Sequence, residues 1–444
     1  MADFFNEDTP HGWLKRVIYK KYLQAYVAKI LNFNLNVVLI DGFAGEGRYG
    51  SEWRNEIESY GSPLIMIMVV LQFYCNFIDR KNQQTIGSTW TNLHETAIRR
   101  FMEELTEEGE EVRRPELVGI GKTYIYLVEN KPKNFKALRR NIQLYLGSFF
   151  RSDVELETSE RDKSVVIQVR HPQFPITISI SRVTFDEFQR ERFHNSKTLT
   201  ILDPFGYSHT PMQHVQEFVD QTSEVLISFM SGFVNRFCRK NPGSVAELYG
   251  IDRPSGNLEE FLRIVRDNAK GSTAENPKSC TKSYIEHMKR RTGSAYAQFY
   301  EMRGKRNNVI YHLIHFANHD KALEAMKETL NTCTQYEGVF KMTDYKVLVE
   351  GIPLELGNAQ NEEELARTIF GEYCGKTVKL VDVKNFVFEH TPFVFRKNAL
   401  KLLEKQTDPK IINVVDSRNS TEKRRKWTYP DWGDWKLTFR GSDT

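Results

Sequence analysis

Hydrophobic positions along the chain follow two spacings, which together predict alternating helices and strands. From about Trp13 to Leu31, apolar residues recur at the three- and four-residue spacing of one helix face. The next segment, Asn36 to Ile40, is apolar at almost every position, as in a strand that is buried on both faces. Further apolar strands are expected at Tyr124–Val128 and Thr198–Leu202, with helical segments between them. This alternation predicts an α/β fold with a largely parallel, Rossmann-like sheet.

The pattern changes twice along the chain, and these changes predict its division. Residues 232–306 are mostly helical in pattern and strongly basic, so we expect an inserted helical subdomain there. From residue 354, three helical segments precede two strands that flank a basic turn, which resembles a winged helix. We therefore expect a Rossmann-like domain over residues 1–353, which contains the insertion, and a C-terminal winged-helix domain over residues 354–444. Winged helices bind either nucleic acid or protein, so the fold alone leaves that choice open.

Length and composition limit the class of protein. At 444 residues the chain exceeds what one hydrophobic core usually supports, which agrees with two domains. Its five cysteines lie far apart without a C-x-x-C pair, which argues against a zinc ribbon, an iron–sulfur cluster and a disulfide framework. No histidine pair has metal-ligand spacing, so we expect no metal site. With neither a signal sequence nor a membrane-length apolar run, we expect a cytoplasmic protein.

Positive charge is concentrated in three segments although the net charge is only +4. Residues 11–40 carry five Lys and Arg without an acid, residues 278–306 carry eight against two acids, and residues 423–426 are consecutive bases. Aromatic residues are interleaved with the first two segments: Trp13, Tyr19, Tyr22 and Tyr26, then Tyr284, Tyr296, Phe299 and Tyr300. This combination suits phosphates with unstacked bases, and it predicts nucleic acid as a partner of the insertion and the winged helix. The alternative is a set of solvated helix faces whose aromatic residues belong to the core.

Three acids directly follow apolar strand segments: Asp41, Glu129 and Asp203. Ligands of open α/β sheets bind at the carboxyl ends of the strands, so we expect these acids to line one cleft. A carboxylate beside flexible glycines can pair with an ammonium group, and Glu129 can accept both hydroxyls of a ribose. S-adenosylmethionine carries both groups, and we predict it as the cofactor. The predicted cofactor-binding residues are Asp41, Gly42, Phe43, Ala44, Gly45, Gly47, Glu129 and Asp186, of which Asp186 either accepts the adenine amino group or is a surface turn acid.

The same glycines formally match a dinucleotide-binding fingerprint, Gly45-x-Gly47-x-x-Gly50. In that fingerprint the glycines open a helix, whereas the next helix here is expected only from Pro63. The acid that should follow about 20 residues later on a second strand is also missing. Binding of a nicotinamide dinucleotide is therefore not favoured.

The segment Asp203-Pro204-Phe205-Gly206-Tyr207 ends an apolar strand with an acid, a proline and aromatic residues. A plain strand followed by an Asp-Pro turn would also explain it. The segment resembles the D-P-P-Y signature of methyltransferases that modify exocyclic amino groups of bases. That resemblance implies that Asp203 and the Pro204 carbonyl accept hydrogen bonds from the amine, while Phe205 or Tyr207 stacks on the ring. These four residues are the predicted catalytic residues, although Phe205 and Gly206 depart from the signature.

An ordered set of motifs resembles the three-Cys-motif partner protein (TcmP) family. The motifs are IDGFAGEGRY at residues 40–49, GSPL at 61–64, LDPFG at 202–206, YHLIHFA at 311–317 with Met326-Lys327, and Ala399-Leu400-x-x-Leu403-Glu404. They span nearly the whole chain. The resemblance implies a class I methyltransferase-like sheet, S-adenosylmethionine as cofactor and a radical-SAM-like partner protein that bears three cysteines.

These observations predict an S-adenosylmethionine-dependent methyltransferase that acts on an amino group of nucleic acid or a nucleotide-like substrate. Two alternatives stay open. The first is a non-catalytic or partner-dependent nucleic-acid-binding module on a methyltransferase scaffold, which the departure at Phe205 and Gly206 favours. The second is another reaction of S-adenosylmethionine or the use of a different nucleotide.

Overall fold

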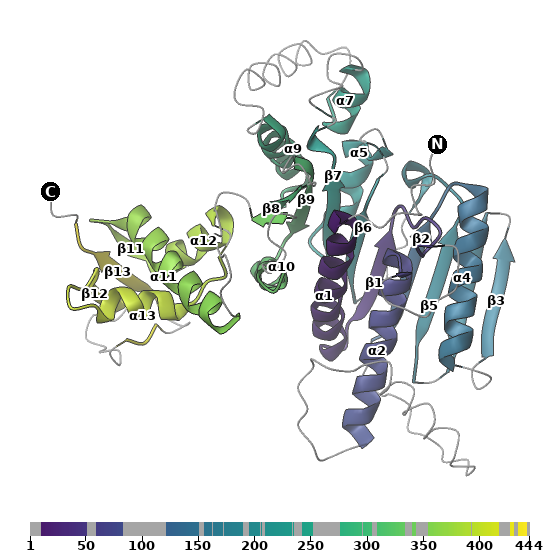
Figure 1. Cartoon of the computed structure of the whole chain (residues 1–444), viewed down its shortest axis with the longest axis horizontal. Helices are drawn as coiled ribbons and strands as arrows, with labels where there is room; N and C mark the ends of the chain where they lie inside the picture. Colours follow the sequence, from purple (N-terminus) through teal and green to yellow (C-terminus); the bar gives the residue numbers. More distant parts are fainter. Residues whose placement is uncertain are drawn as a thin grey trace. The chain divides into compact units, whose positions relative to one another are not determined.

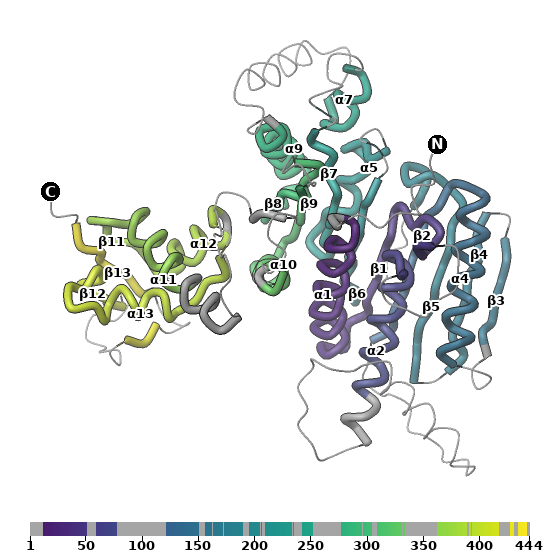
Figure 2. Tube along the Cα trace, in the orientation of Figure 1, coloured from purple at the N-terminus to yellow at the C-terminus, as the bar shows by residue number. Residues whose placement is uncertain are grey.

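The chain forms two compact units, which are shown in Figure 1 and traced in Figure 2. The computed structural model describes residues 10–50, 59–82, 121–150, 155–161, 163–171, 173–189, 195–204, 206, 209–232, 234, 242–251, 276–294, 296–303, 309–333, 340–342, 354–391, 393–416, 427–429 and 434–441. The first unit holds residues 1–319 and 336–340, and the second holds residues 320–335 and 341–444.

A ten-stranded mixed sheet forms the centre of the first unit, in the order β10-β8-β9-β7-β6-β1-β2-β5-β4-β3. Five neighbouring strands run parallel: β5 (Ile176–Ser181), β2 (Thr123–Val128), β1 (Asn36–Asp41), β6 (Ser196–Leu202) and β7 (Ser223–Phe229). The strands beyond them are β9 (Val309–Ala317), β8 (Tyr296–Arg303) and β10 (Phe340–Met342) on one side, and β4 (Ser164–Arg170) and β3 (Glu155–Arg161) on the other. Among these, β9 is antiparallel to β7 and β8, and β4 is antiparallel to β5 and β3. The parallel strands reverse their order at β1, which confirms the predicted Rossmann-like fold class.

Helices cover both faces of this sheet. One face carries α1 (Pro10–Asn32) and α2 (Ser62–Asn82), which pack together, with α4 (Pro132–Phe150) beside them (Figure 1). The opposite face packs against α5 (Met212–Val215), α7 (Pro242–Leu248) and α9 (Asn276–Thr292). Residues Val38 and Ile40 of β1 belong to that second core, which explains why the strand is apolar at successive positions. None of the helices in the described part of the chain is long and apolar enough to cross a membrane.

The expected insertion over residues 232–306 is only partly helical. Helices α7 and α9 lie within it, but β8 is an inner strand of the main sheet, so the assignment of residues 296–303 to a helical subdomain is wrong. The polar residues of this strand interrupt its apolar pattern, so the sequence does not predict it. Two of them, Gln298 and Glu301, are buried, and both have partners: Tyr300 Oη donates to Gln298 Oε1 at 2.8 Å, and Arg303 pairs with Glu301.

The second unit combines helices with a small antiparallel sheet. Its elements are α10 (Asp320–Asn331), α11 (Leu354–Tyr373), β11 (Thr377–Lys379), α12 (Leu380–His390), α13 (Lys397–Lys405), β12 (Ile411–Asp416) and β13 (Trp435–Phe439). The sheet has the order β11-β13-β12. Helices α11, α12 and α13 share one apolar core with this sheet.

Lys327 binds α10 to the end of α12. Its fully buried Nζ donates to the carbonyl oxygens of Val387, Phe388, Thr391 and Phe393 at 2.7, 2.9, 2.8 and 3.1 Å. The last carbonyls of a helix have no partner within it, so the ammonium group fills that role. Burial lowers the pKa of Lys327, whereas four acceptor oxygens favour its charged form. Helix α10 belongs to the second unit, and Lys327 is one of its contacts there, whereas the sequence predicts the boundary at residue 354.

Candidate active site at the carboxyl edge of the sheet

The three predicted acids lie close together at the carboxyl edge of the parallel strands. In the register of the sheet, Asp41 is paired with Leu127 of β2 and Ile201 of β6. Glu129 and Asp203 follow those partners by two residues, or about 7 Å along the strands. Both Asp203 and Glu129 contribute to raising the pKa of the Asp41 carboxyl group, so the three acids act on one another electrostatically. The structure therefore brings these predicted residues to one place.

Asp41 is a fully buried carboxylate with one oxygen unused. Its Oδ1 accepts a hydrogen bond from the Phe43 backbone N–H at 3.0 Å, and the Ser62 hydroxyl also hydrogen-bonds the carboxylate. Among the described residues, Oδ2 has no hydrogen-bond partner. Burial raises the pKa of Asp41 from its ordinary value of 3.8 to about 6. An unused acceptor on a buried carboxylate suits a positively charged group of a ligand.

Backbone conformation and close packing account for the glycines after β1. Gly45 and Gly47 have φ angles of 60° and 79°, the left-handed conformation that glycine adopts without strain. A Cβ on Gly42 would lie 2.6 Å from the Leu202 side chain, and a Cβ on Gly47 would lie 2.8 Å from that of Leu138. The loop is therefore pressed against β6 and α4 as it leaves the strand.

The other predicted cofactor-binding residues differ in their surroundings. The Ala44 N–H donates to the Val128 carbonyl oxygen at 2.9 Å, which joins the loop to the end of β2. The half-buried Phe43 ring packs on Phe185, with ring centroids 5.6 Å apart. Asp186 follows Phe185 in the short 3-10 helix η2 (Phe185–Glu187), and its side chain is exposed. Asp186 is thus accessible, whereas Ala44 is buried and Phe43 is half-buried.

Glu129 is held in position at the end of β2. Its Oε1 accepts a hydrogen bond from the Lys131 backbone N–H at 2.7 Å, and its own N–H donates to the Ser181 carbonyl oxygen at 3.0 Å. The residue is 5% exposed. A carboxylate fixed in this way keeps acceptor capacity for neutral hydroxyl groups beside the glycine loop.

Asp203 forms an ion pair with Lys15 of α1, which the sequence does not single out. The Lys15 Nζ donates to Asp203 Oδ2, and the two side chains are only 12% and 26% exposed. Burial opposes the charge on Lys15, but Asp203 and neighbouring tyrosines hold its pKa well above the ordinary value. Pro204 is buried directly after the acid. The predicted catalytic residues Phe205 and Tyr207 lie outside the described residues.

Tyrosines surround this ion pair, and sequence reasoning did not assign them to the site. The Lys15 Nζ lies 5.4 Å from the centroid of the Tyr311 ring. Tyr19 follows Lys15 by one turn of α1. The loop after β1 contributes Tyr49, and the Arg16 guanidinium carbon lies over the Tyr49 ring, 4.3 Å from its centroid. The surroundings of Asp203 are therefore built from α1 and Tyr311 of β9 as well as from β6.

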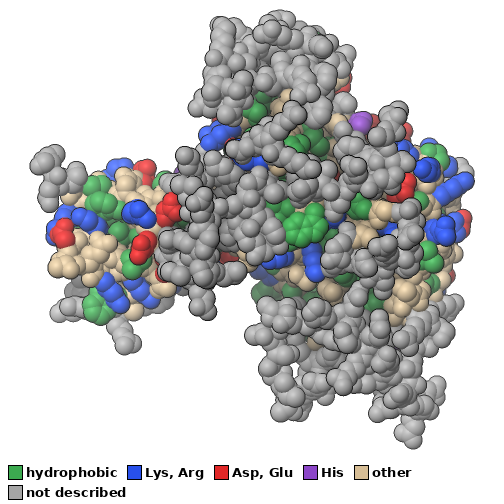
Figure 3. Space-filling view, viewed as in Figure 1, with side chains coloured by type: hydrophobic (Ala, Val, Ile, Leu, Met, Phe, Trp, Pro, Cys, Tyr) green, Lys and Arg blue, Asp and Glu red, His purple; other side chains and the backbone are tan. Residues whose placement is uncertain are grey.

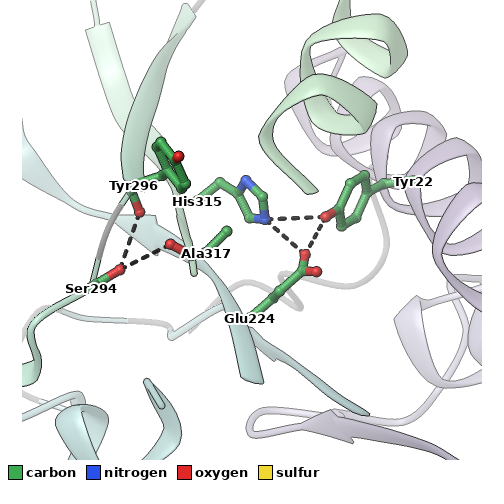
Figure 4. Close-up of polar contacts among 6 residues, drawn as sticks. All are labelled: Tyr22, Glu224, Ser294, Tyr296, His315 and Ala317. Atoms are coloured by element: carbon green, nitrogen blue, oxygen red, sulfur yellow. Dashed lines mark hydrogen bonds and ion pairs between the residues drawn. The ribbon is translucent and has the colours of Figure 1, made fainter. Parts of the chain in front are cut away.

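A second buried polar cluster lies at the opposite edge of the sheet (Figure 4). Tyr22 of α1 donates to Glu224 of β7, and its Oη lies 3.2 Å from Nε2 of His315, which is 3.1 Å from Glu224 Oε2. Glu224 is near the start of β7, away from the carboxyl ends where ligands bind, so the cluster anchors α1 to the sheet. Neither this cluster nor any other group of His, Cys, Asp and Glu in the described segments is arranged to hold a metal ion.

Most aromatic residues of the basic segments belong to the core. Tyr19, Tyr22, Tyr26, Tyr284, Phe299 and Tyr300 are all 8% exposed or less. The expectation that these rings stack on unpaired bases is therefore wrong, because the amphipathic elements turn them inward. On the face drawn in Figure 3, basic and acidic side chains are mixed over the second unit. The consecutive bases at residues 423–426 lie outside the described residues.

Comparisons with known proteins give only distant similarities. No family model matches the chain, and no curated protein matches it. The Legionella pneumophila protein LPL1258, described by the family model DUF519, is 11% identical at a TM-score of 0.32, over 74% of this chain and 96% of that one. Trm1 from Pyrococcus horikoshii, solved with S-adenosyl-L-methionine, is 14% identical at a TM-score of 0.33, over 82% of this chain and 74% of that one. The plantazolicin methyltransferase BpumL, solved with SAH, is 7% identical at a TM-score of 0.23, over 69% of this chain and 85% of that one.

Proposed function

We propose that this protein is an S-adenosylmethionine-dependent methyltransferase that acts on an amino group. The observation that supports this most is the convergence of Asp41, Glu129 and Asp203 at one sheet edge, with Oδ2 of the buried Asp41 unused. Three acids on adjacent strand ends offer acceptors for an ammonium group, a ribose and an acceptor amine. We further propose that nucleic acid or a nucleotide-like molecule carries the acceptor amine, as the Asp203-Pro204 pair suggests.

Asp41 and Glu129 would hold the cofactor in this proposal. Asp41 would pair with the ammonium of the aminoacyl group, Glu129 would accept the ribose hydroxyls, and the exposed Asp186 would accept the adenine amino group. When bound, S-adenosylmethionine supplies a methyl group whose bond to sulfur breaks, with the electron pair left on sulfur, as the acceptor nitrogen bonds to carbon. The protein contributes the fixed position of these acids, which are set before any ligand arrives.

Asp203 and the Pro204 carbonyl would orient the acceptor amine. The carboxylate accepts one N–H and the carbonyl oxygen accepts another, which leaves the nitrogen lone pair directed away from both. Asp203 also stabilises the positive charge that develops on nitrogen, and it can take up the proton that the amine loses. Proline is suited to this position because its carbonyl lies on a rigid backbone that has no competing N–H.

Calorimetry and methyl transfer test this proposal. We expect saturable binding of S-adenosylmethionine and S-adenosylhomocysteine to the purified chain. With tritiated cofactor and total cellular RNA and DNA as acceptor probes, Asp203→Asn should keep cofactor binding and lower methyl transfer about 100-fold or more, since it removes an acid–base group. Glu217→Gln, an exposed position on a short 3-10 helix, is the matched control. Absence of cofactor binding, or full activity of Asp203→Asn, would contradict the proposal.

Helix α13 favours nucleic-acid binding as a second candidate function. Lys397, Lys401 and Lys405 recur every four residues and so lie along one side of the helix. The helix's acid, Glu404, accepts a hydrogen bond from Tyr429 Oη at 2.8 Å. We propose that the second unit acts as a winged-helix-like domain whose α13 contacts phosphates. The radical-SAM-like partner protein with three cysteines, implied by the TcmP resemblance, is proposed on that resemblance alone.

Salt dependence separates phosphate binding from other uses of α13. Affinity for a labelled duplex or single strand, measured by fluorescence anisotropy, should fall steeply with salt. The double variant Lys401→Glu/Lys405→Glu should reduce the slope of log K against log salt by about 2, because two phosphate contacts are lost. Lys321→Glu on the exposed side of α10 is the control. A flat salt response would argue against this function, whereas salt-dependent binding without cofactor binding would favour a non-catalytic module.

A further inference from the structure

The acceptor side of the site already holds a cation, the ammonium group of Lys15. Lys15 reaches from α1 to the carboxylate of Asp203, and its side chain is only 12% exposed. A buried ion pair is weak evidence for a stabilising role, because the desolvation of both charges offsets their attraction. This pair lies at a strand end of the carboxyl edge, where open α/β sheets bind ligands. Its position therefore calls for an explanation beyond stability.

Asp203 and the Tyr311 ring contact the Lys15 ammonium, and Tyr19 acts on it electrostatically; together these groups are called the cage. Asp203 supplies the negative charge, and the Tyr311 ring lies with its centroid 5.4 Å from Nζ. Tyr19, one helical turn further along α1, is fixed at the end of β7, with its Oη 3.5 Å from Ser228 Oγ. An aromatic ring beside a carboxylate is a setting in which proteins bind ammonium groups.

The residue three positions after the acid departs from the signature of base-modifying methyltransferases. The D-P-P-Y signature places an aromatic residue three positions after the acid, where this chain has Gly206. Glycine has no side chain to stack on a nucleobase. What remains around Asp203 in the described residues is the Lys15 ammonium and the neighbouring tyrosines.

We propose that this cage, defined by Asp203 and Tyr311 beside Tyr19, is the acceptor pocket, and that the acceptor amine of the proposed function is a basic alkylamine that binds as its ammonium form in the place that Lys15 occupies. Before methyl transfer, the ammonium group gives one proton to the Asp203 carboxylate, and the freed nitrogen lone pair then bonds to the methyl carbon as the carbon–sulfur bond of the cofactor breaks. Its use as an acceptor pocket rests on the proposed methyltransferase function, whereas the cation site itself does not. Lys15 is then an internal competitor of the acceptor. Because it is tethered, its effective concentration reaches the millimolar range or above, and the acceptor must displace it.

Removing the internal competitor should open the cage to an external amine. We expect n-propylammonium chloride to raise the melting temperature of Lys15→Ala saturably, by about 2–4 °C, relative to sodium chloride of equal ionic strength. The wild-type chain should show no such response, since Lys15 fills the cage. The double variant Lys15→Ala/Asp203→Asn should show none either, because the cage has lost its charge. Circular dichroism establishes that each variant is folded.

The outcomes separate the cation site from the proposed function. No saturable response in a folded Lys15→Ala chain would overturn the cage, and so would an equal response in the double variant. If Lys15→Ala does not fold, Lys15→Ser replaces it, and recovery of folding by the amine would support the cage. S-adenosylhomocysteine binding is measured on the same variant. If the variant responds to the amine but does not bind S-adenosylhomocysteine, the proposed function alone is contradicted.

If the variant binds both the amine and S-adenosylhomocysteine, mass spectrometry should detect N-methylpropylamine after incubation with S-adenosylmethionine. Absence of this product would overturn the acceptor role.

Discussion

Replacing Asp41 with Asn is expected to stabilise the ligand-free protein and to abolish cofactor binding. The carboxylate is fully buried and leaves Oδ2 without a partner among the described residues, so its charge is poorly compensated. Burial raises its pKa from 3.8 to about 6, and the neutral amide removes that unfavourable charge. At pH 7 the gain should be about 1–3 kcal/mol, because each pKa unit corresponds to about 1.4 kcal/mol. Urea unfolding and calorimetry with S-adenosylhomocysteine measure the two effects.

The pH dependence of this effect has a defined sign. Because the pKa of Asp41 is higher in the folded than in the unfolded chain, the folded state binds more protons between about pH 4 and pH 6. The contribution of Asp41 to stability is therefore most favourable below pH 4, falls as the pH rises to about 6 and stays constant above. The stability difference between Asp41→Asn and wild type should grow over that interval and then level off. A difference independent of pH, or retained cofactor binding, would contradict the assignment; Glu217→Gln is again the control.

The sequence predicts the arrangement of the strand ends well because their pattern is local. Asp41, Glu129 and Asp203 each follow an apolar run, and adjacent parallel strands necessarily bring such residues to one edge. The sheet register then places them without further information from distant segments. For the same reason the doubly wound order around β1 follows from the alternation of strands and helices.

The partner of Asp203 could not be predicted in this way. Lys15 lies 188 positions earlier in the chain, and the contact depends on how α1 lies across the sheet. The sequence did contain a signal, since Lys15 shares its helix face with Tyr19, Tyr22 and Tyr26, which are all buried. A lysine in line with a buried stripe is unusual, because lysine is almost never buried unless it is paired, so its position indicates a buried partner. Strand β8 was missed for a different reason, because the buried polar residues Gln298 and Glu301 interrupt its apolar pattern, although each contacts a residue two positions along the same strand.

Lys327→Met is expected to destabilise the C-terminal unit more than any surface substitution would. Methionine keeps most of the side-chain volume but removes the donor that serves four backbone carbonyl oxygens. Those carbonyls lie at the end of α12 and just beyond it, where backbone donors of the helix run out, and of the four the Val387 oxygen also accepts from the Thr391 hydroxyl at 2.7 Å. A buried acceptor left without a donor costs about 1–3 kcal/mol, and the loss of several here outweighs the relief from burying one charge less. Urea unfolding followed by circular dichroism should show an early transition for this unit.

The matched control for this substitution lies on the same helix. Lys321→Met removes an exposed lysine that pairs with Glu324, and exposed pairs of this kind contribute only about 0–1 kcal/mol. If the two variants unfold at the same urea concentration, the carbonyl cluster does not depend on Lys327, and α10 would be held by apolar packing alone. If Lys327→Met alone unfolds early, this lysine makes α10 part of the second unit. A domain expressed from residue 354 would then lack the donor that α12 needs, and we expect it to be less stable than one that starts before Asp320.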